Sequence, residues 1–299
     1  MSTVIDKPSP LAVWVMAARP RTLPAAIVPV VVGSAIARAD GAFSAGPCLA
    51  ALAGACLIQI GTNFANDYFD FKKGADTDAR QGPTRVTQAG LASPKAVLTA
   101  TAIAFGLAVL VGCYLVAVGG WPIVAIGVLS ILSGLAYTGG PYPLGYNGLG
   151  EVFVFIFFGL VAVLGTYYVQ ALHLSSLAWG LAVPVGLIAA AINVVNNLRD
   201  IETDRVAGKK TLSARFGARF THGYYATLLA GAYLVPSALV ATGKLGLKGL
   251  LPLLTLPLAL KLFASVRRDS GPVLNGTLAG TAKLLMIFGL LLSVGLLLP

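Results

Sequence analysis

The stretch AVLTATAIAFGLAVLVGCYLVAV, residues 96–118, carries no charged side chain from one end to the other. It is longer than the about 20 apolar residues that an α-helix needs to cross a bilayer. The rest of the chain has a similar character, because 57% of its 299 residues are hydrophobic. Only 11% are charged, whereas a soluble protein has about 25%. We therefore expect an integral membrane protein.

Nine stretches of the chain are long and apolar enough to be candidate membrane helices. They cover residues 23–38, 48–65, 96–118, 121–138, 150–171, 177–197, 222–242, 249–264 and 277–298. No segment between them has the composition of a separate soluble domain. The sequence thus predicts an all-α fold, a bundle of nine transmembrane helices that forms a single domain over residues 1–299.

The basic residues predict how this bundle lies in the membrane. Most of the 21 Lys and Arg residues fall in the N-terminal tail and in the loops after the second, sixth and eighth candidate helices. All of these lie on the same side, which the positive-inside rule assigns to the cytoplasm. An odd number of helices then places the C-terminus outside. The net charge of +10 is explained by topology and anionic lipid headgroups, and not by nucleic acid.

Two polar segments interrupt the apolar chain at the ends of two candidate helices. The first begins NDYFD at residues 66–70, and the second begins NNLRD at residues 196–200. In each, an Asn precedes an Asp by four residues, a spacing that puts both side chains on one face of a helix. Further acidic and then basic residues follow in both. We interpret the segments as two pseudo-repeats with one acidic motif each, around residues 66–85 and 196–210.

The residue types in these segments indicate a chemistry. One explanation is a solvated loop that balances its own Lys and Arg. However, acidic residues contribute little to topology, and a polar side chain on the last turn of a membrane helix is costly unless it has a partner. Carboxylate and amide oxygens without His or Cys are the donors that Mg²⁺ prefers. Because neighbouring guanidinium and ammonium groups bind phosphate, the pattern favours Mg²⁺ that holds a phosphorylated substrate.

A phosphate site at the end of membrane helices narrows the class of substrate. If the rest of the substrate is a long hydrocarbon, the helix bundle can hold it. Departure of diphosphate would then leave an allylic cation. Aromatic faces stabilise such a cation, although simple aromatic packing explains the same residues. The candidate aromatic side chains are Tyr68, Phe69, Tyr137 and Tyr142.

Four stretches of the chain resemble the UbiA superfamily of intramembrane aromatic prenyltransferases. They are RPRTLPAAIVPVVVGSA (19–35), NDYFDFKKGADTDARQGPTRVTQAG (66–90), YTGGPYPLGYNGLGE (137–151) and NNLRDIETDRVAGKKTLSARFG (196–217). The six-residue spacing from Asp70 to Asp76, followed by Arg80-x-Gly82-Pro83-x-Arg85, departs from the four-residue spacing of the 4-hydroxybenzoate branch. It is similar to the 1,4-dihydroxy-2-naphthoate polyprenyltransferases of menaquinone biosynthesis.

This resemblance implies a bundle around a central cavity, with cytosolic cap segments over it. It also implies two Mg²⁺ ions, with Asp67 as either a further ligand or an orienting neighbour. The implied ligands are Asn66, Asp70 and Asp76 for one ion and Asn196, Asp200 and Asp204 for the other. The implied diphosphate-binding residues are Arg80, Arg85, Lys209 and Lys210, and the candidate catalytic residues are Asp70, Asp200, Lys209 and Tyr142.

The implied reaction joins a polyprenyl diphosphate to 1,4-dihydroxy-2-naphthoate. Diphosphate leaves, the ring loses its carboxylate as CO₂, and demethylmenaquinol forms. Such an enzyme is expected to be a multi-pass protein of a bacterial-type plasma membrane, with membrane lipid around it and with its N-terminus and active-site loops in the cytoplasm. Two alternatives fit the same motifs. One is the same fold with another aromatic or phosphoribosyl acceptor, and the other is a membrane transporter.

Four further residues have two readings each. Arg19 and Arg21 would contact an acidic acceptor, or would only anchor the first helix at the membrane surface. Glu151 would complement the dipole at a helix N-terminus, or would face the cavity as intramembrane carboxylates commonly do. Tyr142 lies in a Gly- and Pro-rich loop, which would be a simple turn or a lid near the site.

Overall fold

The computed structural model describes residues 8–74 and 81–298, and every regular element within those ranges is helical. The predicted all-α fold is therefore confirmed for this part of the chain. Short helices α1 (Pro10–Ala18), α6 (Gly150–Val154) and α9 (Ile201–Val206) accompany the longer ones. The longer helices are α2 (Pro24–Ala39), α3 (Ala45–Lys72), α4 (Pro94–Gly119), α5 (Trp121–Ala136), α7 (Ala162–Ala171), α8 (Ser176–Arg199), α10 (Leu212–Ala241), α11 (Leu256–Arg268) and α12 (Leu274–Leu297).

Seven helices or helix runs in the described ranges are long and apolar enough to cross a membrane. They are α3, α4, α8, α10, the run Gly150–Ala171, the run Leu247–Arg268 and the run Gly271–Leu297. An eighth span is possible in length if Pro10–Thr22 and Pro24–Ala39, which meet at a bend of 52°, count as one. Helix α5 is apolar but has 16 residues. The structure thus supports a multi-pass helical membrane protein with seven or eight spans in the described ranges. The predicted count of nine also includes α5, which is shorter than the others.

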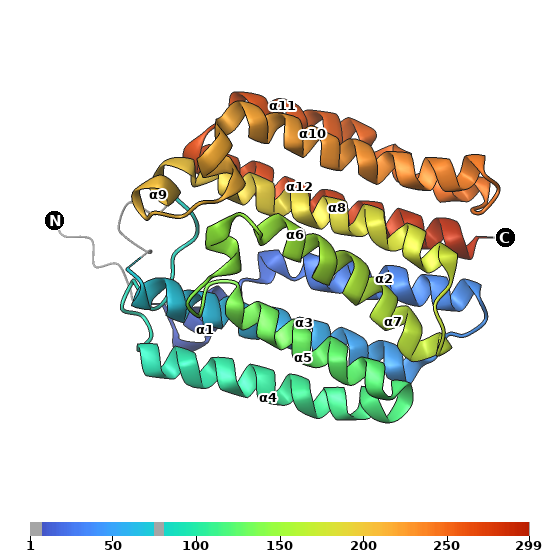
Figure 1. Cartoon of the computed structure of the whole chain (residues 1–299), viewed down its shortest axis with the longest axis horizontal. Helices are drawn as coiled ribbons and strands as arrows, with labels where there is room; N and C mark the ends of the chain where they lie inside the picture. Colours follow the sequence, from blue (N-terminus) through green and yellow to red (C-terminus); the bar gives the residue numbers. More distant parts are fainter. Residues whose placement is uncertain (1–7, 75–80, 299) are drawn as a thin grey trace.

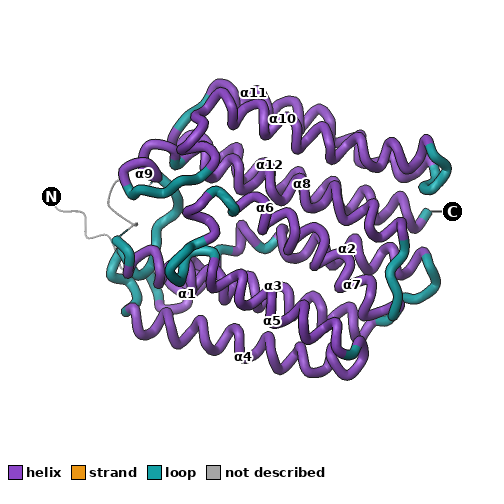
Figure 2. The backbone as a smooth tube through the Cα atoms, in the orientation of Figure 1, coloured by secondary structure: helices purple, strands orange, loops and turns teal. Residues whose placement is uncertain are grey.

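The helices run side by side along the long axis of the molecule (Figure 1). Helices α3, α4 and α5 lie on one side, α10 and α11 lie on the other, and α2, α8, α12 and the α6–α7 run lie between them. The connecting loops gather at the two ends of the bundle (Figure 2). Apolar residues on the outer helices, such as Leu110, Leu234 and Leu260, are exposed, which suits contact with lipid.

Helix α8 is the centre of the packing. Its side chains Val185, Ile188 and Val194 are fully buried, and it packs against α10 on one side and the α6–α7 run on another. The crossing with the latter is close because glycines face each other there. A Cβ on Gly159 would lie 2.6 Å from the Cα of Gly186, so no larger residue fits without separating the helices. This close approach is typical of membrane helix pairs with small residues at the contact.

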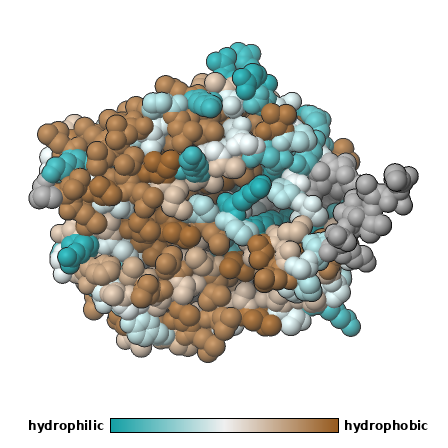
Figure 3. All heavy atoms as spheres, turned by 180° about the vertical axis from the view of Figure 1, so that it is seen from behind, coloured by the Kyte–Doolittle hydropathy of each residue, from teal (hydrophilic) through white to brown (hydrophobic). Residues whose placement is uncertain are grey.

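The two acidic motifs meet at one end of the bundle. Helices α3 and α8 both run toward the end at which α9 lies (Figure 1), and each carries its motif in its last turns. The loop that follows α3 and the loop between α5 and α6 lie at this same end. Seen from the opposite side, the hydrophilic surface gathers toward this end of the otherwise hydrophobic molecule (Figure 3). The predicted pairing of the two motifs therefore has a structural basis.

Candidate active site

Asp70, in the last turns of α3, lies at the centre of the first motif. It is buried, and its Oδ2 accepts a hydrogen bond at 2.6 Å from Nη2 of Arg85, which is also buried. Its Oδ1 accepts a short hydrogen bond from the hydroxyl of Tyr146. Arg85 comes from the loop after α3 and Tyr146 from the loop before α6. Asp70 thus joins three segments that are distant in sequence.

Asp67 lies one turn earlier on α3 and has a different environment. Its side chain is 1% exposed, and its two oxygens accept hydrogen bonds from the backbone N–H groups of Val86 at 3.0 Å and Thr87 at 3.1 Å. These contacts fix the backbone directly after Arg85. The structure therefore shows Asp67 in an orienting position, with both oxygens engaged by the loop.

Asp200 lies at the C-terminal end of α8 and faces its own arginine. Nε and Nη2 of Arg199 donate to the two carboxylate oxygens at 2.8 and 2.6 Å. The same guanidinium donates to Oδ1 of Asn196 at 2.9 Å and to Oδ1 of Asn275 at 2.8 Å. Asn275 in turn donates to the backbone oxygen of Gln81 at 3.0 Å. The second motif is therefore tied to α12 and to the loop of the first motif.

Asp204, on α9, is the second aspartate of the second motif. Its pKa is raised to about 6, chiefly by burial and also by the charge of Asp200, against the opposing effect of the nearby Lys209 ammonium. Nζ of Lys209 lies 3.6 Å from Oδ1 of Asp204 and 4.6 Å from the centre of the Tyr146 ring. Lys73 lies 5.2 Å from the centre of the same ring. Tyr146 thus bridges the two motifs, since it also binds Asp70.

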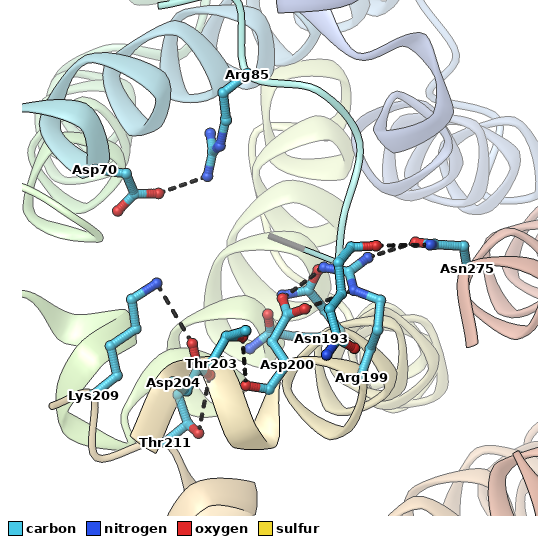
Figure 4. Close-up of polar contacts among 12 residues, drawn as sticks. Asp70, Arg85, Asn193, Arg199, Asp200, Thr203, Asp204, Lys209, Thr211 and Asn275 are labelled. Atoms are coloured by element: carbon cyan, nitrogen blue, oxygen red, sulfur yellow. Dashed lines mark hydrogen bonds and ion pairs between the residues drawn. The ribbon is translucent and has the colours of Figure 1, made fainter. Parts of the chain in front are cut away.

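Figure 4 shows these groups around one space, with Asp70 and Arg85 on one side and Lys209, Asp204, Asp200 and Arg199 opposite. Asn66 lies close by on α3, where its Oδ1 accepts a hydrogen bond at 2.8 Å from the hydroxyl of Thr138. The structure therefore brings together the predicted residues Asn66, Asp70, Arg85, Asn196, Asp200, Asp204 and Lys209.

The other predicted residues differ in exposure. Tyr142 is 61% exposed, in the loop between α5 and α6. Arg21 and Lys210 are exposed, and Arg19 is half-buried with a left-handed backbone at φ 52°. Asp76 and Arg80, which the sequence assigned to the first ion and to the diphosphate, lie outside the described residues.

Three residues of this site were not singled out from the sequence for a role in it. Tyr146 lies four residues after Tyr142 in the same loop, which was predicted to be a turn or a lid near the site, and it is Tyr146 that contacts Asp70. Arg199 and Lys73 were counted only as topology signals. The signal for Arg199 was its position inside NNLRD, next to Asp200.

A cavity of about 690 Å³ extends from this site into the bundle. It lies between α3, α4, α5 and the α6–α7 run, and most of its lining is apolar. Asn66, Asn63 and Tyr137 are among its few polar lining residues. Because Asn66 belongs to the first motif, the apolar cavity and the ionic site meet. A ligand with a charged head and a hydrocarbon tail fits this arrangement.

The donors at the site suit a hard cation. They are carboxylate and amide oxygens, which are the ligands of Mg²⁺ in proteins. Within residues 8–74 and 81–298, no three His, Cys, Asp or Glu side chains are grouped closely enough to hold a metal alone. An ion here would therefore be completed by amide oxygens, water or ligand phosphates, as Mg²⁺ sites commonly are.

The fold and the site together define a helical membrane protein with an ionic site of carboxylates and cations at one end of an apolar cavity. The chain matches the UbiA prenyltransferase family over residues 26–272, and it belongs to that family. The family resemblance drawn from the four sequence stretches is thereby confirmed.

Named relatives and a solved structure agree with this assignment. The chain is 42% identical to 1,4-dihydroxy-2-naphthoate octaprenyltransferase of Mycobacterium tuberculosis over 89% of this chain and 91% of that protein. It is 38% identical to the Escherichia coli enzyme of the same name, over 94% and 95%. It shares its fold with a UbiA homolog from Archaeoglobus fulgidus bound to GPP and Mg²⁺, at 13% identity and a TM-score of 0.68, over 94% and 99% of the two chains.

Proposed function

We propose that this protein transfers a polyprenyl group from a polyprenyl diphosphate to 1,4-dihydroxy-2-naphthoate. The products are diphosphate, CO₂ and demethylmenaquinol. The observation that carries the proposal is the junction at Asn66 of an apolar cavity with a site of carboxylates and cations. The activity named for the relatives, with identities of 34–42% over most of the chain, supports the choice of acceptor.

Mg²⁺ is the expected cofactor, and two ions suit two motifs. Bound Mg²⁺ would neutralise the charge that develops on the departing diphosphate. Asp70 and Asp200 would each be the central ligand of one ion, and Asp67 would hold the loop. The remaining proposed ligands are Asn66 and Asp76 for the first ion and Asn196 and Asp204 for the second.

Four cations near the motifs would bind the diphosphate. Arg85 and Arg199 are paired with Asp70 and Asp200, while Lys209 and Lys73 lie near the Tyr146 ring. Guanidinium groups bind phosphate oxygens in a bidentate manner. A diphosphate that draws the two arginines toward itself would leave the carboxylate oxygens of the motifs to coordinate the metal. Arg80 and Lys210 remain proposed contacts of the same group.

Tyr146 is a second aromatic candidate beside the predicted Tyr142. The ammonium groups of Lys73 and Lys209 both lie over its ring, and its hydroxyl binds Asp70. An aromatic face at this point would stabilise an allylic cation as the diphosphate leaves. The apolar cavity would hold the prenyl chain and exclude water from the cation.

We also propose the membrane orientation that the basic residues predict. The motif end of the bundle, with the N-terminus, would face the cytoplasm, and the C-terminus would lie outside the plasma membrane. Helix α5 would be the ninth span, because its length together with Tyr137 and the following loop connects α4 with the motif end. Reporter fusions to the loop after α4 and to the loop before α6 would test this arrangement.

The proposed reaction is testable with purified protein in lipid. Polyprenyl diphosphate, 1,4-dihydroxy-2-naphthoate and Mg²⁺ would be supplied with or without EDTA, and product would be followed by mass spectrometry. We expect an EDTA-sensitive, prenylated and decarboxylated naphthoquinol. Parallel reactions with 4-hydroxybenzoate and homogentisate identify the acceptor. Product with one of these alone would retain the chemistry and overturn the acceptor, and binding of the prenyl diphosphate without product from any acceptor would favour transport.

A further inference from the structure

Two buried polar atoms on the neighbouring helices α6 and α8 have no hydrogen-bond partner among the residues that the structure describes. They are Oε2 of Glu151 and Nδ2 of Asn193. Glu151 is 1% exposed, at the start of α6, and Asn193 lies on α8 one turn before the second motif. Burial of an unpaired polar atom costs about 1–3 kcal/mol, and more when the group is charged. Two such atoms require an explanation, because Gly150, the residue before Glu151, lies against the Asn193 amide.

The two side chains belong to one cluster. Nδ2 of Asn197 donates to Oε1 of Glu151 at 2.6 Å, and the hydroxyl of Tyr137 donates to Oδ1 of Asn193 at 3.0 Å. Gly150 allows this arrangement, because a Cβ there would lie 2.9 Å from both Nδ2 of Asn193 and the Tyr137 hydroxyl. Tyr137 also lines the apolar cavity, so the cluster adjoins the cavity at this residue.

The first half of the molecule contains an Asn at the matching position, and its amide nitrogen has hydrogen-bond partners. Asn63 precedes Asn66 by three residues, just as Asn193 precedes Asn196. However, Nδ2 of Asn63 donates to the backbone oxygen of Ala18 at 2.9 Å and to Oγ1 of Thr22 at 2.9 Å. In the first half, protein groups therefore accept both hydrogen bonds of this amide. In the second half, the amide nitrogen of Asn193 is left unpaired, and so is Oε2 of Glu151 on the neighbouring helix.

We infer that Glu151 and Asn193 form a pocket for a ring hydroxyl of the aromatic acceptor. A hydroxyl has one donor and two acceptor sites. It can accept from Nδ2 of Asn193 and donate to Oε2 of Glu151, which satisfies both unpaired atoms. Metal ligation is a poorer explanation for Glu151, because an ion would exclude the Asn193 amide donor. The inference rests on the proposed function, to which it adds the residue that receives the acceptor's proton.

The chemistry balances without a further reactant. The ring carbon that carries the carboxylate forms a bond to the first carbon of the prenyl chain. At the same time, the bond between this prenyl carbon and the diphosphate oxygen breaks, and diphosphate leaves with the electron pair. The ring hydroxyl gives its proton to Glu151 and becomes a carbonyl. Loss of CO₂ then returns an electron pair to the ring. The carbonyl oxygen takes the proton back from Glu151, and the ring is aromatic again.

Glu151→Gln tests the pocket with little change in shape. Its amide oxygen would still accept from Asn197, so its NH₂ group would replace Oε2 and could not take a proton. A general base contributes about 10²- to 10⁴-fold to a rate, so we expect kcat to fall by at least about 100-fold. The KM for prenyl diphosphate should stay within about twofold of wild type. Glu151→Asp should recover part of the rate, and Glu202→Gln, at a side chain that is 77% exposed, is the matched control.

Acceptor analogues separate a direct contact from a structural role. The two monomethyl ethers of 1,4-dihydroxy-2-naphthoate each remove one hydroxyl donor, and their binding would be measured by competition. Wild type should bind one ether at least about 10-fold more weakly than the parent. Glu151→Gln should lose this preference, because its NH₂ group donates equally well to a hydroxyl or an ether oxygen.

The outcomes are distinct. A stable Glu151→Gln variant with wild-type kcat and unchanged preference between parent and ethers would overturn the pocket and leave the proposed function intact. Equal rises in the KM of donor and acceptor with a lowered melting temperature would also overturn it, because they indicate a structural role. Absence of conversion by the wild type, with prenyl diphosphate still bound, would overturn the proposed function and this inference with it.

Discussion

Asp67→Asn distinguishes an orienting residue from a metal ligand. The wild-type carboxylate accepts backbone hydrogen bonds from Val86 and Thr87 while 1% exposed. An Asn side chain keeps one carbonyl oxygen for one of these N–H groups. Its NH₂ group must face the other, so two donors meet and one buried N–H loses its acceptor.

The size of this effect follows from the two contacts. A hydrogen bond to a charged group contributes about 1.5–3 kcal/mol, and a buried donor without a partner costs about 1–3 kcal/mol. These two figures describe the same lost contact in part, so we expect a loss of about 2–4 kcal/mol in the free energy of unfolding. The loop that carries Arg85 would also be displaced, because Val86 follows it directly. A raised KM for prenyl diphosphate should accompany the lost stability.

Thermal unfolding and Mg²⁺ titration of the same variant provide the test. The melting temperature should fall by several degrees in the presence and in the absence of Mg²⁺, while the Mg²⁺ concentration for half-maximal activity changes little. Asp269→Asn is the control, since its partner Arg268 is 76% exposed and such surface pairs contribute about 0–1 kcal/mol. An unchanged melting temperature with a large rise in the Mg²⁺ requirement would refute the reasoning and make Asp67 a ligand.

Three other predictions address the site itself. Asp70→Ala and Asp200→Ala should abolish turnover in proteins that remain folded by circular dichroism, and full activity of either variant would remove the metal assignment. Lys209→Ala should raise the KM for prenyl diphosphate about 10-fold or more, because it removes a charge-assisted contact; an unchanged apparent affinity would exclude that contact. Lowering the pH through about 6 should raise the Mg²⁺ requirement, because the raised pKa of Asp204 keeps its carboxyl protonated up to that pH, and a proton competes with the cation. Asp204→Asn should lose this pH dependence, and the same slope in the variant would assign it to another group.

The sequence predicted the helices well where composition alone decides them. The predicted stretch 177–197 corresponds closely to α8, Ser176–Arg199. The predicted stretch 48–65 ended too early, because α3 continues to Lys72. The prediction stopped where apolar residues stop, but the helix goes on because its polar side chains find partners in two loops. Hydropathy registers the cost of a polar side chain and not the partner that offsets it.

The site was predictable as a set of residues and not as a set of roles. Both motifs could be found from an Asn and an Asp four residues apart. The pairing of Arg85 with Asp70, and the position of Tyr146 between the motifs, depend on loops that return to α3 from distant parts of the chain. No local pattern distinguishes Tyr146 from Tyr142, because the two share one Gly- and Pro-rich loop. The backbone N–H of Lys210 donates to the backbone oxygen of Tyr146 at 2.6 Å, and this is a contact between distant segments that a local pattern does not register.

The residue after the first Asn differs between the two motifs, but in both it binds a neighbouring segment. Asp67 follows Asn66 just as Asn197 follows Asn196, and both Asp67 and Asn197 are buried. Asp67 holds the loop of Arg85 through two backbone amides, and Asn197 holds the carboxylate of Glu151. In each half, this middle position binds a neighbouring segment, while the outer Asn and Asp are the proposed metal ligands. An exchange of roles between positions 67 and 70 would therefore require the loop after α3 to leave its place. For this reason the stability of Asp67→Asn, more than its activity, decides between the two readings.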